Sequence, residues 1–375
     1  MKKTLLKVFC VVLMVAMLVP CFASCGDKNE AFKIGATGPL TGEAASYGIS
    51  VQNGAALAVK HLNAKDGGLK FEFKILDDKA GAADATTNYA TLADWGMQLS
   101  LGGVTSGAGE AFAKQADIDS VFCMTPSGSA DPVIKDLKYS FRLCFGDPDQ
   151  GTIAAEKIKA MKDADADLKV GAIFDDSDTY SKGIYDAFKA KMATLQITYS
   201  EQKFDAENKV DFSTQAEALK DCDVIFMPFY YTEAALFIKK AVEKQSSAIF
   251  FGCDGFDGIA SKVDGVTNKI MYITPFDVNS EDQKVKDFVA AYKAEYDGAE
   301  PDQFAADAYD VVMVLAAALE AKGVTDYDLS AAEISEILYS AITASDFSFD
   351  GLTGSDMKWS SDGKCTKAPK IVELN

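Results

Sequence analysis

Small polar residues that could bind an anion stand in two loops that follow predicted strands. Ser106 begins a predicted helix, where free backbone N–H groups and the helix dipole favour negative charge. Ser127 and Ser129, in the next such loop, could donate further hydrogen bonds. Neither loop contains lysine or arginine, and the phosphate-binding pattern GxxxxGK[ST] is absent from the chain. A carboxylate therefore fits these loops better than a polyphosphate.

An acid and three tyrosines could complete a site for a small molecule. Asp254 precedes a glycine in a loop of the second half of the chain and could pair with an ammonium group. Tyr47, Tyr180 and Tyr230 lie in similar loops and could contribute ring faces and hydroxyls. A site for an anion in one half of the chain and a site for a cation in the other would together bind a zwitterion. The same residue types also serve as ordinary turn and packing residues, which is the alternative for each of them.

The composition excludes several other kinds of site. His61 is the only histidine and Arg142 the only arginine, so a Ser-His-Asp hydrolase would depend on His61. No C-x-x-C pair offers zinc or iron–sulfur spacing. The chain has 37 basic and 56 acidic residues, a net charge of −19, and no basic cluster suited to nucleic acid. We therefore expect a binding protein, not an enzyme, with no catalytic residue, cofactor or metal.

The N-terminus has the features of a bacterial secretion signal. Three lysines precede Val8–Val19, an apolar run of 12 residues that is too short to span a membrane well. Small residues before Cys25 resemble a lipobox, in which this cysteine is lipidated and becomes the new N-terminus. We expect residues 1–24 to be a signal peptide and 25–31 a tether; the alternative is an ordinary signal peptide cut nearby. Loss of residues 1–24 changes the net charge from −19 to −22.

Strand-like and helix-like segments alternate through the rest of the chain. Strands are predicted at 32–37, 71–77, 99–102, 121–124, 170–174, 224–229, 248–251, 270–274 and 371–374. Helices are predicted at 46–63, 83–95, 151–161, 180–195, 232–242, 284–296 and 304–321. Such alternation predicts parallel sheets with helices on both faces, and its length predicts two Rossmann-like lobes. Ligands of these folds bind beyond the carboxyl ends of strands, where the polar loops stand.

Motifs along the whole chain resemble those of one protein family. They are KIGATGPLTG (33–42), TPS (125–127), FR (141–142), DQG (149–151), GCDG (252–255) and FDGLTG (349–354). Read in this order, they resemble the leucine/isoleucine/valine-type branched-chain amino-acid binding proteins of ABC importers, which are type I periplasmic binding proteins. The resemblance implies two α/β lobes that close on ligand like a flytrap.

The resemblance also implies domain boundaries. Three hinge crossovers are expected near Arg142–Pro148, Thr274–Asp277 and Asp346–Gly351. The N-terminal lobe would then comprise 32–145 plus 276–348, and the C-terminal lobe 146–275 plus 349–375.

Site residues follow from the matching positions. The resemblance implies that Ser106, Ser127 and Ser129 hold the ligand α-carboxylate. It implies that Asp254, where the family usually has Glu, holds the α-ammonium with help from Tyr180 and Tyr230. The ligand side chain would contact Tyr47, Val104, Thr105 and Phe304. Ala80 and Thr105 stand where some members have a disulfide, so the side-chain pocket is expected to differ there.

We therefore expect an extracytoplasmic, lipid-anchored monomer that captures a free amino acid, of branched-chain or aliphatic type, and delivers it to an ABC permease. Two alternatives remain at this point. One is a binder of the same family for an amide, a urea-like compound or an aromatic acid. The other is an extracellular ligand-sensing module.

Overall fold

A computed structural model describes residues 29–374. The predicted signal peptide and the lipidation site Cys25 lie outside the described residues. The chain from Ala31 onward forms one compact unit. Within the described residues, no helix combines the length and apolar character needed to cross a membrane.

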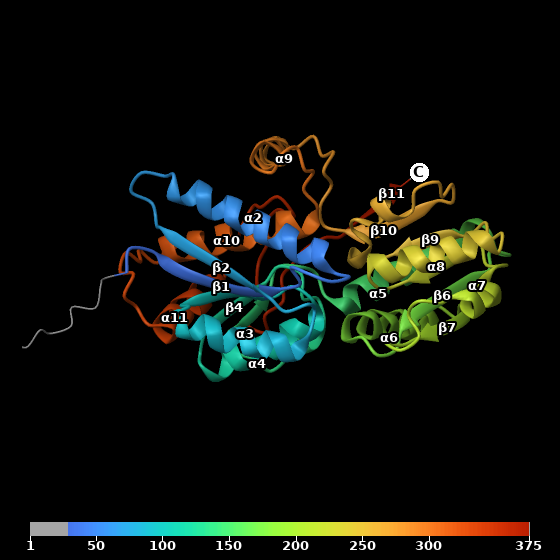
Figure 1. Cartoon of the computed structure of the whole chain (residues 1–375), viewed down its shortest axis with the longest axis horizontal. Helices are drawn as coiled ribbons and strands as arrows, with labels where there is room; N and C mark the ends of the chain where they lie inside the picture. Colours follow the sequence, from blue (N-terminus) through green and yellow to red (C-terminus); the bar gives the residue numbers. More distant parts are fainter. Residues whose placement is uncertain (1–28, 375) are drawn as a thin grey trace, which may run out of the picture. The chain divides into compact units, whose positions relative to one another are not determined.

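The first lobe is built on a five-stranded parallel sheet (Figure 1). Its strands, in spatial order, are β2 (Phe71–Asp77), β1 (Phe32–Gly38), β3 (Leu99–Gly103), β4 (Phe122–Thr125) and β5 (Ser140–Arg142). The pairing of β1 with β3 shifts by one residue between Gly35 and Ala36. Strands β3, β4 and β5 are buried along their whole length because helices cover both faces of the sheet, whereas the edge strand β2 is only partly buried.

Two separate apolar cores show which helices cover which face of this sheet. The helices α2 (Ala45–Asn63), α10 (Gln303–Ala321) and α11 (Ala331–Ile342) share one core with the strands. On the other face, α3 (Ala82–Asp94) and α4 (Ser106–Ile118) pack through Leu92 and Phe112 against Met97 and Cys123. Helix α4 therefore begins at the carboxyl end of β3, with its first turn facing the second lobe.

The second lobe has a six-stranded sheet. Its order is β11 (Lys370–Leu374), β10 (Ile270–Thr274), β9 (Ile249–Gly252), β8 (Val224–Met227), β6 (Val170–Asp175) and β7 (Ser200–Phe204), and β11 is antiparallel to β10. Successive side chains of β8 point to opposite faces of this sheet. Phe226 packs with α5 (Asp147–Ala164) and α6 (Thr179–Thr194), while Ile225 packs with α7 (Ser213–Leu219) and α8 (Tyr231–Glu243).

The fold class predicted from the sequence is confirmed, and each predicted strand and helix overlaps one in the structure. Strands β5 and β7 and helices α7 and α11 were not predicted as elements, and of α4 only the start at Ser106 was predicted. Strand β5 ends at Arg142, after which the chain passes to the second lobe, and β10 ends at Thr274. After β10 the chain returns to the first lobe as α9 (Gln283–Glu295).

The third crossover differs from the expectation, because residues 349–365 pack on the first lobe. Trp359 Nε1 donates a hydrogen bond to the carbonyl of Arg142 at 3.0 Å, and Arg142 N donates to Gly363 O at 3.0 Å. The open edge of β5 offers backbone groups that this segment satisfies. Only β11 joins the second sheet, so the crossover follows Cys365 and not Gly351.

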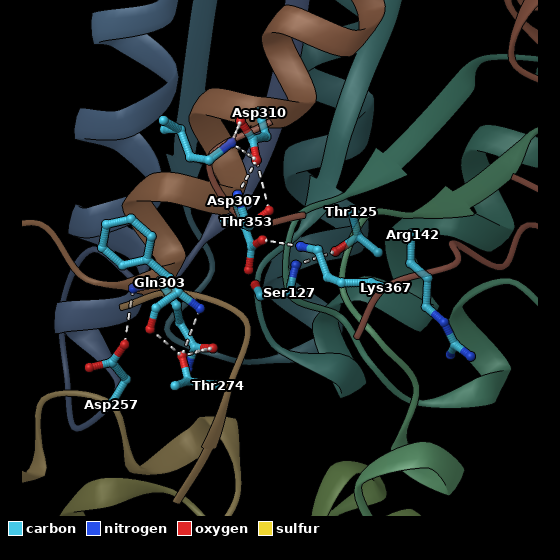
Figure 2. A network of polar contacts seen from close by, with 12 residues as sticks. Thr125, Ser127, Arg142, Asp257, Thr274, Gln303, Asp307, Asp310, Thr353 and Lys367 are labelled. Carbon is cyan, nitrogen blue, oxygen red and sulfur yellow. Dashed lines mark hydrogen bonds and ion pairs between the residues drawn. The ribbon is translucent and has the colours of Figure 1, made fainter. Parts of the chain in front are cut away.

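A buried ion pair holds the start of this third crossover. The Lys367 ammonium lies 2.6 Å from the Asp307 carboxylate of α10, and neither side chain is exposed by more than 3% (Figure 2). On the same helix, Asp310 accepts hydrogen bonds from the backbone and hydroxyl of Thr353 at 2.9 and 2.7 Å. These contacts fix the end of the first lobe at the point where the chain leaves it.

Candidate ligand-binding site

Loops from both lobes enclose a small cavity at the carboxyl ends of the strands. Nine of the ten residues predicted to bind ligand line it, and Ser129 does not. They are Tyr47, Val104, Thr105, Ser106, Ser127, Tyr180, Tyr230, Asp254 and Phe304, together with Gly255. The cavity volume is about 10 Å³, which is room for about one water molecule, so the lobes are closed over it.

Hydroxyl groups dominate the wall that the first lobe contributes. The Ser106 hydroxyl accepts a hydrogen bond from Ala130 N at 3.2 Å, which leaves its proton free to be donated. Ser127 Oγ donates to Val104 O at 2.7 Å, and its backbone N–H donates to Thr125 Oγ1 at 3.3 Å (Figure 2). The first turn of α4 adds backbone N–H groups that have no partner within the helix. This wall can donate hydrogen bonds to an anion without any cationic side chain.

Glycine permits the close approach of β3 to α4 that forms this wall. A Cβ atom on Gly103 would lie 2.6 Å from the backbone nitrogen of Gly109, which is closer than such atoms come. The preceding residue, Gly102, has a φ of +65°, in the left-handed region that favours glycine. The sequence Gly102-Gly103 therefore sets the position of Ser106.

Ser129 lies behind the cavity, at the first crossover. Its carbonyl accepts hydrogen bonds from Arg142 Nη1 at 2.7 Å and from Asp147 N at 3.0 Å. Its hydroxyl is buried without a hydrogen-bond partner, as are both carboxyl oxygens of Asp147. Burial raises the pKa of Asp147 well above its usual range. Ser129 thus joins the strand β5 to the start of α5.

The second lobe contributes a buried acid, Asp254. Its Oδ1 accepts a hydrogen bond from Tyr180 OH at 2.6 Å, and its backbone N–H donates to Gln150 Oε1 at 3.1 Å. Tyr180 OH in turn accepts from Gly255 N at 2.9 Å. Burial raises the pKa of Asp254 to about 6, although the hydrogen bonds from Tyr180 and Gln150 oppose this. No lysine or arginine among the described residues pairs with this carboxylate, so it is suited to an ammonium group from outside.

Aromatic rings form the remaining walls. The rings of Tyr180 and Tyr230 are stacked with centroids 4.9 Å apart, and the Tyr47 ring lies 4.4 Å from that of Phe304. Tyr47 OH also crosses between the lobes, because it donates to Gly255 O at 2.6 Å and accepts from Tyr231 N at 3.1 Å. Burial holds the pKa of Tyr47 well above its usual 10, so the hydroxyl keeps its proton. Tyr47 is thus both a wall of the cavity and a contact of the closed state.

Gln303 is a second contact between the lobes, and the sequence reasoning missed it. Its Nε2 donates to Asp254 O at 2.6 Å. Its backbone N–H donates to Asp257 Oδ2 at 3.0 Å, as Figure 2 shows. Its Oε1 accepts from Thr274 Oγ1 at the second crossover, at 3.2 Å. Its position directly before the predicted ligand contact Phe304 was the available signal. Gln303 therefore ties the first residue of α10 to the backbone of the proposed ammonium-binding residue.

Residues 31–375 match the profile of the Periplasmic binding protein family, and the chain belongs to this family. A Leu/Ile/Val-binding protein homolog 3 from Brucella melitensis is 29% identical over 302 residues, which are 78% of this chain and 80% of the relative. A leucine-, isoleucine-, valine-, threonine- and alanine-binding protein from Pseudomonas aeruginosa is 28% identical over 84% of each chain.

Solved structures agree with these relatives. The branched-chain amino acid transporter substrate binding protein LivJ from Streptococcus pneumoniae, in complex with isoleucine, is 28% identical and superposes with a TM-score of 0.78. The match covers 92% of this chain and 100% of that one. The two-lobed fold is therefore that of a substrate-binding protein. Among the residues that the structure describes, no group of three or more His, Cys, Asp or Glu side chains is placed to hold a metal.

Proposed function

We propose that the protein binds a free α-amino acid between its lobes and delivers it to an ABC permease. The observation that carries this proposal is the buried Asp254 carboxylate, which lacks a cationic partner among the described residues and shares one cavity with Ser106 at the start of α4. A buried charge is costly unless it is paired, and an α-ammonium group would supply the pair. The hydroxyl and N–H donors of the first lobe would bind the α-carboxylate.

Binding would proceed by closure around the ligand. The first lobe binds the carboxylate through Ser106 and Ser127 in an open state. Closure then brings Asp254 to the ammonium group, and the Tyr47 and Gln303 contacts form at the same time. Affinity therefore depends on how much better the closed state binds the ligand than the open state does. We propose that the closed form is the one that docks on the permease.

We propose that the ligand is of the branched-chain or aliphatic type. The names of the curated relatives support this, as does the isoleucine bound to the Streptococcus pneumoniae protein. Val104, Phe304 and the Tyr47 ring supply apolar surface on the wall where the side chain would lie. We further propose an extracytoplasmic, monomeric protein anchored by lipid on Cys25. Detergent-phase partition of the expressed protein should be lost in Cys25→Ser.

Calorimetry with matched ligands tests the amino-acid proposal. We expect leucine, isoleucine or valine to bind, whereas 4-methylpentanoic acid, which is leucine without its α-amino group, should not. Asp254→Asn should weaken leucine binding by at least about tenfold, the usual effect of losing a charged hydrogen bond. Asp264→Asn, on an exposed residue after the same loop, is the control. Binding of an amide or an aromatic acid, with no binding of any α-amino acid, would show that the assignment of Asp254 is wrong.

A further inference from the structure

A second and larger cavity adjoins the first one between the lobes. Its volume is about 320 Å³, and it shares Thr105 and Tyr230 with the inner cavity. We call it the outer cavity. Its charged lining residues are Glu43, Lys79, Asp175, Asp178, Lys209 and Glu233. The outer cavity thus offers room for a ligand side chain that the inner cavity, at about 10 Å³, lacks.

Thr105 occupies the junction of the two cavities. Its side chain is 5% exposed, and its hydroxyl is buried without a hydrogen-bond partner among the described residues. A buried hydroxyl without a partner is unfavourable, so a polar group is expected to reach it when the site is filled. Thr105 is thus an observation, separate from the charges, that indicates a polar ligand.

The charges of the outer cavity are unbalanced. The Lys209 ammonium is shared between Glu43 at 2.6 Å and Glu233 at 3.1 Å, so it is already neutralised. Lys79 pairs at 3.6 Å with Asp84, which does not line the cavity. Two acids of the lining, Asp175 and Asp178, have no lysine or arginine partner within the part of the chain that the structure describes.

The surroundings of these two acids fix their carboxylates in place. Asp178 caps α6, since its Oδ1 accepts a hydrogen bond from Ser181 N at 2.9 Å. Asp175 Oδ1 accepts from the backbone and hydroxyl of Ser177 at 2.8 and 2.6 Å. Burial, the Asp175 charge and the Glu233 charge raise the pKa of Asp178 to about 6, so it is ionised at pH 7 with no cation to offset it. This arrangement is complementary to a cation.

We propose that the outer cavity receives the ligand side chain, and that the protein therefore binds α-amino acids with a cationic side chain, such as lysine, in addition to aliphatic ones. The aliphatic stem would lie along the Tyr230 ring, and the terminal ammonium group would reach Asp178 and Asp175. This inference rests on the proposed function, because the α-carboxylate and α-ammonium groups occupy the inner site as before. It changes only the class of side chain that the protein accepts.

Calorimetry of the purified protein with L-lysine and L-norleucine tests this inference. The two ligands have the same four-carbon chain, and only lysine carries the terminal ammonium group. We expect lysine to bind about tenfold more tightly than norleucine, the effect of one partly buried charge pair. Leucine is measured in parallel. If leucine binds and lysine binds no better than norleucine, the inference is wrong while the proposed function stands; if no amino acid binds, both are wrong.

Variants locate the contact. Asp178→Asn keeps a helix-capping side chain but removes the charge, so lysine affinity should fall about tenfold while leucine affinity stays within about twofold. Retained leucine binding also shows that the variant is folded. Asp176→Asn, in the same loop but outside the cavity lining, should change neither affinity. Equal lysine affinity in Asp178→Asn and the unmodified protein would refute this assignment of the outer cavity.

Discussion

Removal of the Gln303 side chain should weaken ligand binding although Gln303 does not line the inner cavity. In the closed state its Nε2 donates to the Asp254 carbonyl at 2.6 Å, and this bond joins the two lobes. Gln303→Ala deletes the donor and leaves a buried carbonyl without it, but only after closure. The loss falls on the closed state alone, because in an open state water can satisfy the same carbonyl.

The expected loss of affinity follows from the free-energy cost of one buried hydrogen bond that is not made. An unsatisfied buried acceptor costs about 1–2 kcal/mol, which corresponds to a roughly 5- to 30-fold rise in the dissociation constant. Because the bond forms only on closure, the variant should release its ligand faster than the unmodified protein does. The association rate should be nearly unchanged. The backbone bond from Gln303 N to Asp257 persists in the variant, so closure itself is weakened and not abolished.

Calorimetry gives the affinity, and stopped-flow mixing gives the two rates. Gln283→Ala is a matched control, because Gln283 is also the first residue of a helix, α9, but is exposed to solvent. The unfolding midpoint of ligand-free protein should be similar in the two variants. An unchanged affinity in Gln303→Ala, or a loss that comes entirely from slower association, would refute the assignment of this residue to the closed state.

Three further predictions concern the acid, the ion pair and the glycines. Because burial raises the pKa of Asp254 to about 6, amino-acid affinity should fall as the pH drops below 6. The folded protein also keeps this proton up to a higher pH than the unfolded chain does. The stability of the ligand-free protein should therefore fall as the pH rises from about 4 to 6. Asp254→Asn should abolish the pH dependence of affinity and weaken that of stability, because other buried acids such as Asp178 also have raised pKa values; titrations of affinity and urea unfolding that match those of the unmodified protein would exclude Asp254 as a source. Lys367→Met should lower the free energy of unfolding by about 3–5 kcal/mol because Asp307 is left buried and unpaired. The double variant Lys367→Met/Asp307→Leu should recover most of this loss. Equal losses in the single and the double variant would argue against the ion pair. Gly103→Ala should impair folding or binding, as judged by thermal melting and calorimetry, whereas Gly107→Ala, where a new methyl group meets nothing within 4 Å, should be close to neutral; similar effects at both positions would contradict the steric argument.

The sequence was most informative about buried strands and the loops that follow them. Strands such as β8, which is buried along its whole length, give continuous apolar runs that stand out against the surrounding helices. Strand β7 was missed because it has the sequence SEQKF, with three of its five residues exposed. Strand β5 was missed because three residues are too few for any period to appear.

Those residues of the candidate site that lie close to strand ends could be predicted from the sequence. Ser106 and Asp254 lie within three residues of strand ends, so the position of each at the carboxyl end of its sheet was predictable. The placement of Ser129 could not be predicted, because it depends on hydrogen bonds from Arg142 and Asp147, which come close to Ser129 only in the folded protein. Gln303 was missed for a similar reason, since its partner Asp254 is distant in sequence and belongs to the other lobe.

The position of Trp359 gives the protein a built-in optical probe. The chain has two tryptophans, and the indole of Trp359 is buried with its N–H bonded to the carbonyl of Arg142, the last residue before the first crossover. Trp95 follows α3 and lies beneath the ammonium group of Lys74, far from any crossover in the sequence. Bending at the first crossover should therefore shift the emission of Trp359 and leave that of Trp95 unchanged. Trp95→Phe would isolate this signal, so that opening and closing could be followed by fluorescence without any attached dye.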